Sequence, residues 1–134
     1  MIIVICVDDQ YGMRFYGRRQ SRDRALLERL VDTGKNICMN SCSAKLFSQL
    51  SANVSVQDNF LQTAGPEDIC FVEELPIGGL PENCDQLILY HWNRRYPADM
   101  YFPAEELKKW KLISTCDFPG NSHDKITENI YEKK

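Results

Sequence analysis

The residues of this chain most able to do chemistry are a group of arginines around one carboxylate. Residues 14–29 hold six of the eight arginines and only two acids, Asp23 and Glu28, although the 134-residue chain carries a net charge of −3. Guanidinium groups pair bidentately with phosphates and stack on bases, so this stretch could bind a nucleotide or RNA. The alternative is an ordinary solvated surface. The six arginines are Arg14, Arg18, Arg19, Arg22, Arg24 and Arg29.

A second basic segment, residues 92–96, places Arg94 and Arg95 between Trp92 and Tyr96. Aromatic side chains can stack on bases while neighbouring arginines hold phosphates. This segment therefore belongs to the same hypothesis of an anionic partner.

Cysteine and histidine could bind a metal only if their spacing suited it. Cys6, Cys38 and Cys70 lie in apolar runs, where a reduced thiol behaves as a small hydrophobic side chain. Cys38 and Cys42 form a single C-x-x-x-C pair, and the two histidines lie far apart in the sequence. We therefore expect six reduced thiols, no disulfide and no metal site.

Length and composition indicate the kind of protein that positions these residues. A chain of 134 residues, 43% hydrophobic and 26% charged, suits one globular domain over residues 1–134. The apolar start, residues 1–7, has no basic segment and runs at once into Asp8 and Asp9. We therefore expect neither a signal peptide nor a membrane span, and a cytoplasmic protein.

The apolar pattern predicts strands that alternate with helices, followed by a C-terminal region rich in strands. This order indicates an α/β fold whose sheet is parallel at first and gains antiparallel edges. Expected strands are residues 2–7, 36–39, 53–56, 69–72 and 87–92, with a closing antiparallel pair at 111–114 and 126–131. Expected helices begin at the caps Ser21 and Ser43 and end at Gly34 and Leu50, with shorter ones at 58–64 and 103–109. Residues 12–20 and 75–83 are expected to be loops.

The C-terminal third resembles dihydrofolate reductase in the order of its motifs. The strand at 87–92 precedes an Asp-x-x-Phe-Pro loop at 99–103, then Trp110 and a closing strand at 126–134. Residues 3–13 resemble the first strand and glycine loop of that family. The resemblance covers nearly the whole chain, and it implies a three-layer α/β sandwich with a mostly parallel central sheet and antiparallel C-terminal edge strands.

Several positions depart from the pattern of that family. A Gly-Arg-x-Thr turn and a Gly-Gly pair hold the NADPH phosphates in the family, but the matching segments here are Asn-Ser-Cys-Ser at 40–43 and Glu-Glu at 73–74. Residues 19–21, Arg-Gln-Ser, replace the Pro-Trp that closes over nicotinamide, and residues 51–68 look too few for the adenosine site. Because carboxylates repel phosphates, we expect that no NADPH or other cofactor binds.

One part of the substrate site could survive. Asp23 matches the pterin-binding carboxylate of the family within one residue, although a carboxylate at a helix start is also favoured by the helix dipole. Tyr90 stands where the family has a pterin-binding threonine. The resemblance implies a pocket at the carboxyl ends of the parallel strands, suited to a hydrogen-bond-donating heterocycle with an acidic tail. Its expected residues are Cys6, Asp23, Leu27 and Tyr90, with Arg18, Arg19 and Arg22 at the mouth.

The interpretation we favour is a dihydrofolate-reductase-like fold that has lost its reductase site and binds a small ligand or a protein. The alternatives are a divergent NAD(P)H-dependent reductase of a pterin-like heterocycle, and phosphate or RNA binding through the arginines. The chain also resembles a group of short bacterial proteins that carry an automatic ribonuclease Z label. The sequence gives that label no support, because it contains no H-x-H-x-D-H motif, G-x-S-x-G elbow or P-loop.

The cysteine pattern yields a first prediction. We expect the purified protein, unfolded in guanidinium chloride, to titrate six free thiols per chain with a chromogenic disulfide reagent, and elemental analysis to find no stoichiometric metal. Fewer than six thiols, or one zinc ion per chain, would contradict this expectation.

Overall fold

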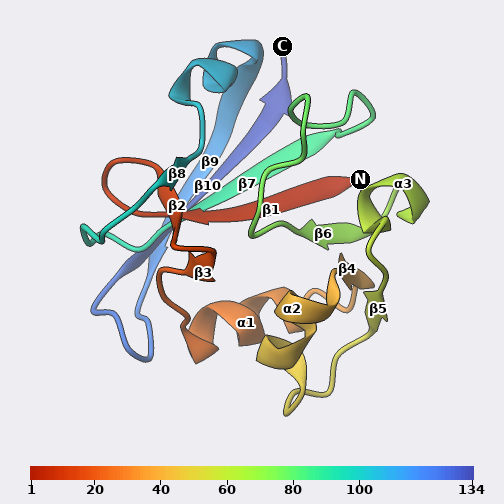
Figure 1. Ribbon diagram of the computed structural model, residues 1–134, viewed down its shortest axis with the longest axis horizontal. Coiled ribbons are helices and arrows are strands. Elements are labelled where there is room, and N and C mark those ends of the chain that lie inside the picture. Colours follow the sequence, from red (N-terminus) through yellow and green to blue (C-terminus); the bar gives the residue numbers. More distant parts are fainter.

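The computed structural model describes residues 1–134 and is built on a seven-stranded sheet with the order β5-β4-β6-β1-β7-β10-β9 (Figure 1). The first five strands in this order run parallel, and β10 pairs antiparallel with both β7 and β9. The predicted parallel sheet with antiparallel C-terminal edge strands is therefore confirmed. The strands are β1 (Ile2–Val7), β4 (Ile37–Met39), β5 (Val54–Val56), β6 (Ile69–Phe71), β7 (Gln86–His91), β9 (Trp110–Phe118) and β10 (Ile126–Lys133).

Short helices cover the sheet. Figure 1 shows α1 and α2 together on the side of β4 and β6, with the C-terminal strands β9 and β10 beyond β7. None of the helices combines the length and the apolar composition that crossing a membrane requires. The helices are α1 (Arg24–Val31), α2 (Ser41–Ala44), η1 (Lys45–Phe47), α3 (Phe60–Thr63) and η2 (Ala104–Lys109).

Alternation along β1 builds a hydrophobic core on each face of the sheet. Ile3, Ile5 and Val7 are buried in one core, and Val4 is buried in the other, because successive side chains of a strand point to opposite faces. Leu26, Leu27 and Leu30 of α1 are buried in the second core. The two cores make the three layers that the resemblance implies.

The start of α1 differs from the prediction. Asp23, not Ser21, is its N-cap, and the carboxylate accepts a hydrogen bond of 2.9 Å from the backbone N–H of Ala25. The helix ends at Val31, three residues before Gly34. Ser21 therefore lies ahead of the helix, where its hydroxyl is free to contact other elements.

The second helix also starts elsewhere than predicted. Asn40 caps α2 by accepting a hydrogen bond of 3.0 Å from the backbone N–H of Ser43. Ser43 lies inside the helix, and its hydroxyl reaches out to a neighbouring segment instead of capping. The helix continues only as the 3-10 turn η1, which ends at Phe47.

The expected loop at residues 12–20 contains strands. A second, three-stranded sheet has the order β3-β2-β8, formed by β3 (Arg18–Arg19), β2 (Gly12–Phe15) and β8 (Met100–Tyr101). Strands of two to four residues are too short to show a recognisable period. β3 pairs with β2 through a local turn, whereas β8 reaches β2 from more than 80 residues away. This small sheet sets the direction in which residues 19–23 approach α1.

We predict a clear difference between two leucine substitutions. Leu30→Ala removes a side chain that is 1% exposed, and it should lower the free energy of unfolding by about 2–5 kcal/mol. Leu112→Ala in β9 changes a side chain that is 49% exposed, and it should alter the same quantity by no more than about 0.5 kcal/mol. Urea unfolding followed by tryptophan fluorescence measures both. Equal effects would show that the α1 face is not part of the core.

Candidate functional site

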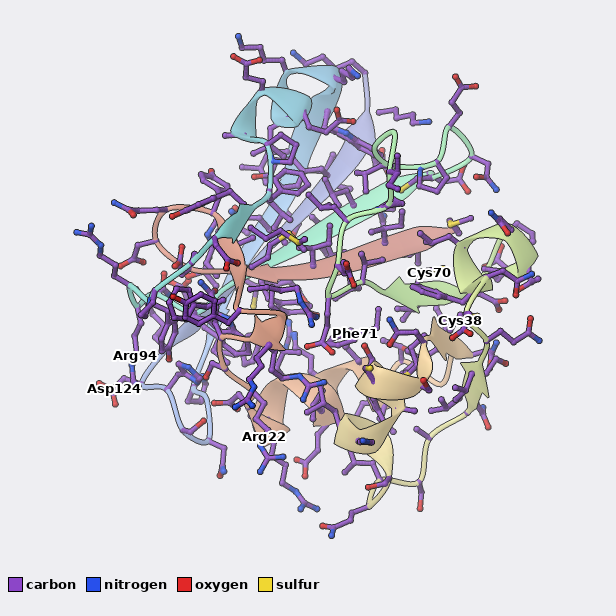
Figure 2. All side chains as sticks on the ribbon, viewed as in Figure 1. Arg22, Cys38, Cys70, Phe71, Arg94 and Asp124 are labelled. Atoms are coloured by element: carbon purple, nitrogen blue, oxygen red, sulfur yellow. The ribbon has the colours of Figure 1, made fainter.

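A narrow cavity lies between α1 and the carboxyl ends of β1 and β6. Cys6, Leu27 and Phe71 form part of its wall, and its empty space is about 430 Å³ with the mouth included. Only about 20 Å³ of this space can hold the centre of a water molecule, so the interior admits little more than water as it stands. Figure 2 shows Arg22 near the start of α1 and Phe71 at the carboxyl end of β6, two of the residues that line the cavity.

The cavity brings together most of the residues that the sequence suggested for a ligand site. Cys6, Asp23, Leu27, Arg19 and Arg22 all line it. Burial, together with the charge of a neighbouring glutamate, raises the pKa of Cys6 far above the ordinary value, so this residue presents a neutral thiol. Five of the seven suggested residues thus border one cavity.

Tyr90 and Arg18 do not line this cavity. Tyr90 pairs in register with Cys6, but its hydroxyl donates a 2.7 Å hydrogen bond to the Oε2 atom of Glu128 on the adjacent strand β10. The Tyr90 ring therefore leans toward β10 and lines a separate, open groove with Arg29. Arg18 is exposed on β3.

Asp23 is buried, and both of its oxygens already have partners. Oδ1 accepts hydrogen bonds from the backbone N–H groups of Ala25 (2.9 Å) and Asn121 (2.8 Å). Oδ2 accepts from the backbone N–H of Ser122 (2.8 Å) and lies 2.9 Å from Nδ1 of His123. The carboxylate thus fastens the loop between β9 and β10 to the start of α1, and it offers a ligand no free acceptor.

The hydrogen bonds decide the charge of Asp23. Burial by itself raises the pKa of this carboxyl group, but the bonds from the Asn121 backbone and the His123 ring outweigh burial and hold the pKa at about 2, below the ordinary 3.8. Asp23 is therefore a carboxylate at neutral pH, and its negative charge is spread over several donors.

His123 is a residue of this site that sequence reasoning missed. The residue is buried, and its ring stacks on Trp92 with centroids 4.6 Å apart. The Nε2 atom lies 2.9 Å from the hydroxyl of Tyr96 and 3.1 Å from that of Ser21. No spacing in the sequence signals this contact, because His123 lies 100 or more residues from Asp23 and Ser21.

A second polar cluster closes the other side of the cavity around Glu73. Arg19 donates two hydrogen bonds to this carboxylate, from Nε (2.7 Å) and from Nη2 (2.9 Å). The hydroxyl of Ser43 donates a third of 2.7 Å, and Arg19 also reaches the carbonyl oxygen of Cys42 at 3.1 Å. The Glu73 side chain is only 12% exposed, so this is a partly buried, fully bonded ion pair.

The arginine stretch does not form one free basic surface. Arg19 pairs with Glu73, Arg24 pairs with Glu28 at 2.7 Å, and Arg29 pairs with Glu128 at 2.9 Å, while Arg22 forms no ion pair. About half of the local positive charge is therefore neutralised inside the chain. No group of three or more histidine, cysteine or acidic side chains is arranged to hold a metal ion.

The sheet order, the helix positions and the place of the cavity define a dihydrofolate-reductase-like fold. The chain is similar to the dihydrofolate reductase from Enterococcus faecalis complexed with NADP(H) and RAB-propyl, with a TM-score of 0.62 over 99% of this chain and 95% of that chain. Only 10% of the residues are identical, so the similarity establishes the fold and not the activity. No protein-family model matches the sequence, and no curated protein does.

We predict that Asp23 makes stability depend on pH. Because its pKa in the folded protein, about 2, lies below the ordinary 3.8, the stabilisation is complete above about pH 4 and is lost as the pH falls toward 2. The free energy of unfolding should fall by about 2 kcal/mol over this interval. Asp23→Asn should be less stable at pH 7 and lack this step, whereas the exposed Asp124→Asn should keep it. Urea unfolding at a series of pH values tests this, and identical profiles for the two variants would contradict it.

Proposed function

We propose that this chain is a small-ligand-binding protein of dihydrofolate-reductase-like fold that does not use NAD(P)H, and that the cavity beside α1 is its binding site. The ion pair of Glu73 with Arg19 is the observation that carries the proposal. Two features of this ion pair support the proposal: the position of the Glu73 carboxylate just beyond the end of a strand, and the number of hydrogen bonds that it accepts.

Glu73 lies where an α/β protein usually binds an anion. It follows β6, and Ser43 belongs to the helix that follows β4, the neighbouring parallel strand. Ligands of open α/β sheets bind outside the carboxyl ends of such strands, with phosphates near helix starts. In the dihydrofolate reductase pattern the matching segments hold the dinucleotide phosphates. Here the protein places its own carboxylate there and satisfies it with a guanidinium and a hydroxyl.

Two free-energy costs would oppose the binding of a dinucleotide at this position. Its phosphates would approach a carboxylate of the same sign, and a like-charge contact costs on the order of kcal/mol even near the protein surface. Binding would also require Arg19 to leave Glu73, and breaking a partly buried ion pair leaves the second charge without its partner. Both costs weigh against the alternative of a divergent NAD(P)H-dependent reductase.

The remaining cavity suits a small ligand with polar ends. Leu26, Leu27 and Trp92 supply apolar surface, and the Oε1 atom of Gln20 is a buried acceptor without a hydrogen-bond partner. Arg22 borders the same cavity and has no acidic partner. An apolar ring with a hydrogen-bond donor for Gln20 and an acidic group for Arg22 would satisfy these side chains, provided that residues at the mouth move to admit it.

The phosphate or RNA alternative is less well supported. Three arginines of the 14–29 stretch are engaged with glutamates, which leaves fewer guanidinium groups to neutralise phosphates. No second observation on this surface favours a nucleic acid over the cavity as the binding site.

A thermal-shift panel tests the proposed function. We expect no change in melting temperature with NADPH or NADH at 1 mM, and a saturable rise of several degrees with at least one folate-like heterocyclic acid, because a ligand that binds only the folded state stabilises it by mass action. Arg22→Ala should weaken that binding about tenfold, whereas Arg18→Ala, outside the cavity, should leave it unchanged. Saturable NADPH binding at micromolar concentration would refute the proposal.

A further inference from the structure

Three side chains at the cavity form a hydrogen-bonded chain that the proposed function does not use. The Oγ atom of Ser21 lies 3.1 Å from Nε2 of His123, and Nδ1 of His123 lies 2.9 Å from Oδ2 of Asp23. The hydroxyl thus contacts one ring nitrogen and the carboxylate contacts the other. This is the connectivity of a Ser-His-Asp triad, and both distances lie within the 2.6–3.2 Å expected of a nucleophile and its base.

The partners of His123 determine which ring nitrogen carries the proton. The Asp23 carboxylate can only accept hydrogen bonds, so Nδ1 donates its proton to it. In the neutral ring Nε2 then has a lone pair, and the hydroxyls of Ser21 (3.1 Å) and Tyr96 (2.9 Å) both lie within hydrogen-bond distance of it. Stacking on Trp92 holds the ring in the orientation in which both contacts are made. His123 is therefore set up as a base toward Ser21.

The serine is open to a ligand, while its partners are not. Ser21 is half-buried and lines the cavity, whereas the side chains of His123 and Asp23 are 1% and 0% exposed. The buried pair is therefore shielded from solvent, and Ser21 is the member of the chain that is partly exposed. Arg22, the next residue, borders the same cavity and pairs with no acid, so its guanidinium can attract an ester that carries an acidic group.

The contact between Ser21 and His123 is not needed to hold the β9–β10 loop in place. The backbone bonds of Asn121, Ser122 and His123 to Asp23 hold the loop without Ser21. The hydroxyl of Tyr96 lies 2.9 Å from Nε2 and could satisfy that atom alone. Ser21 is a second hydroxyl on the same nitrogen, and it is the one that faces the cavity.

We propose that Ser21 is a nucleophile that hydrolyses small carboxylic esters in this cavity, with His123 as general base and Asp23 as a positioning residue. The Oγ atom bonds to the carbonyl carbon while its proton passes to Nε2 of His123. The bond to the leaving oxygen then breaks, and that oxygen takes the proton and departs as an alcohol. Water attacks the acyl-serine by the reverse proton path and releases the carboxylic acid.

The cavity limits the class of ester. Its apolar wall and narrow interior favour a short acyl group, which enters once residues at the mouth move, and Arg22 favours an ester that also carries an acid. This inference rests on the proposed function only in using the same cavity as the ligand site. Water is the sole co-reactant, so no cofactor is needed.

The test combines an activity with a covalent label. We expect the wild-type protein to hydrolyse p-nitrophenyl acetate and to react with an alkyl fluorophosphonate, with one adduct per chain that peptide mass spectrometry places on Ser21. Ser21→Ala should lower hydrolysis about 100-fold and abolish the adduct, and His123→Gln should lower both rates about 100-fold. Ser114→Ala, on the exposed face of β9, is the matched control and should change neither.

Two further variants separate catalysis from structure. Tyr96→Phe removes the competing hydroxyl and should leave labelling at least as fast as in the wild type. Loss of labelling in a folded Tyr96→Phe protein would assign the reaction to Tyr96 and overturn the role of Ser21. In ¹⁵N NMR of the imidazole, we expect the proton on Nδ1 in the wild type and its redistribution in Asp23→Asn, a change that a purely structural role would not produce.

The outcomes distinguish this inference from the proposed function. An adduct on another residue, or equal hydrolysis by wild type and Ser21→Ala, overturns the triad even if the thermal-shift panel finds a ligand. An adduct on Ser21 that Ser21→Ala removes supports the triad even if the panel finds none. Circular dichroism of every variant confirms that it is folded before the rates are compared.

Discussion

The start of α1 depends on one carboxylate that serves two distant parts of the chain. Asp23 caps the helix through Ala25 and binds the loop between β9 and β10 through backbone groups about 100 residues away. Each bond alone contributes on the order of 1 kcal/mol, but a buried carboxylate without its donors would be costly, so the contacts must form together. The position of His123 and of the loop that carries it beside α1 depends on these bonds.

Charge compensation within the chain determines the electrostatics at the carboxyl ends of β4 and β6. The sheet brings the ends of β4 and β6 together, which in an α/β protein creates a place for an anion. Glu73 fills that place, and Arg19 and Ser43 satisfy it. The chain thus has a dihydrofolate-reductase-like fold in which the carboxyl ends of these strands carry a carboxylate that is satisfied within the chain.

The polar clusters around Glu73 and around His123 both border the cavity, and they differ in the groups that they present to it. The Glu73 cluster is closed, since each carboxylate oxygen has a donor inside the chain. The cluster around His123 ends in a hydroxyl that still faces the cavity. The cavity is shaped by the sheet and α1, whereas Asp23, Glu73 and His123 lie on the segments between these elements, so the polar groups beside the cavity can change without a change of fold.

The sequence by itself determined the order of the longer strands and helices. β1 was predictable because it is a continuous apolar run, and the buried face of α1 because its leucines recur at helical spacing. The tertiary structure alone decided the short strands β2, β3 and β8, which form only by pairing with one another. It also decided that Tyr90 turns to Glu128 and that His123 meets Asp23 and Ser21. Such contacts join residues 38 to 102 positions apart. No local pattern encodes them, because only the packed sheet sets which loops become neighbours.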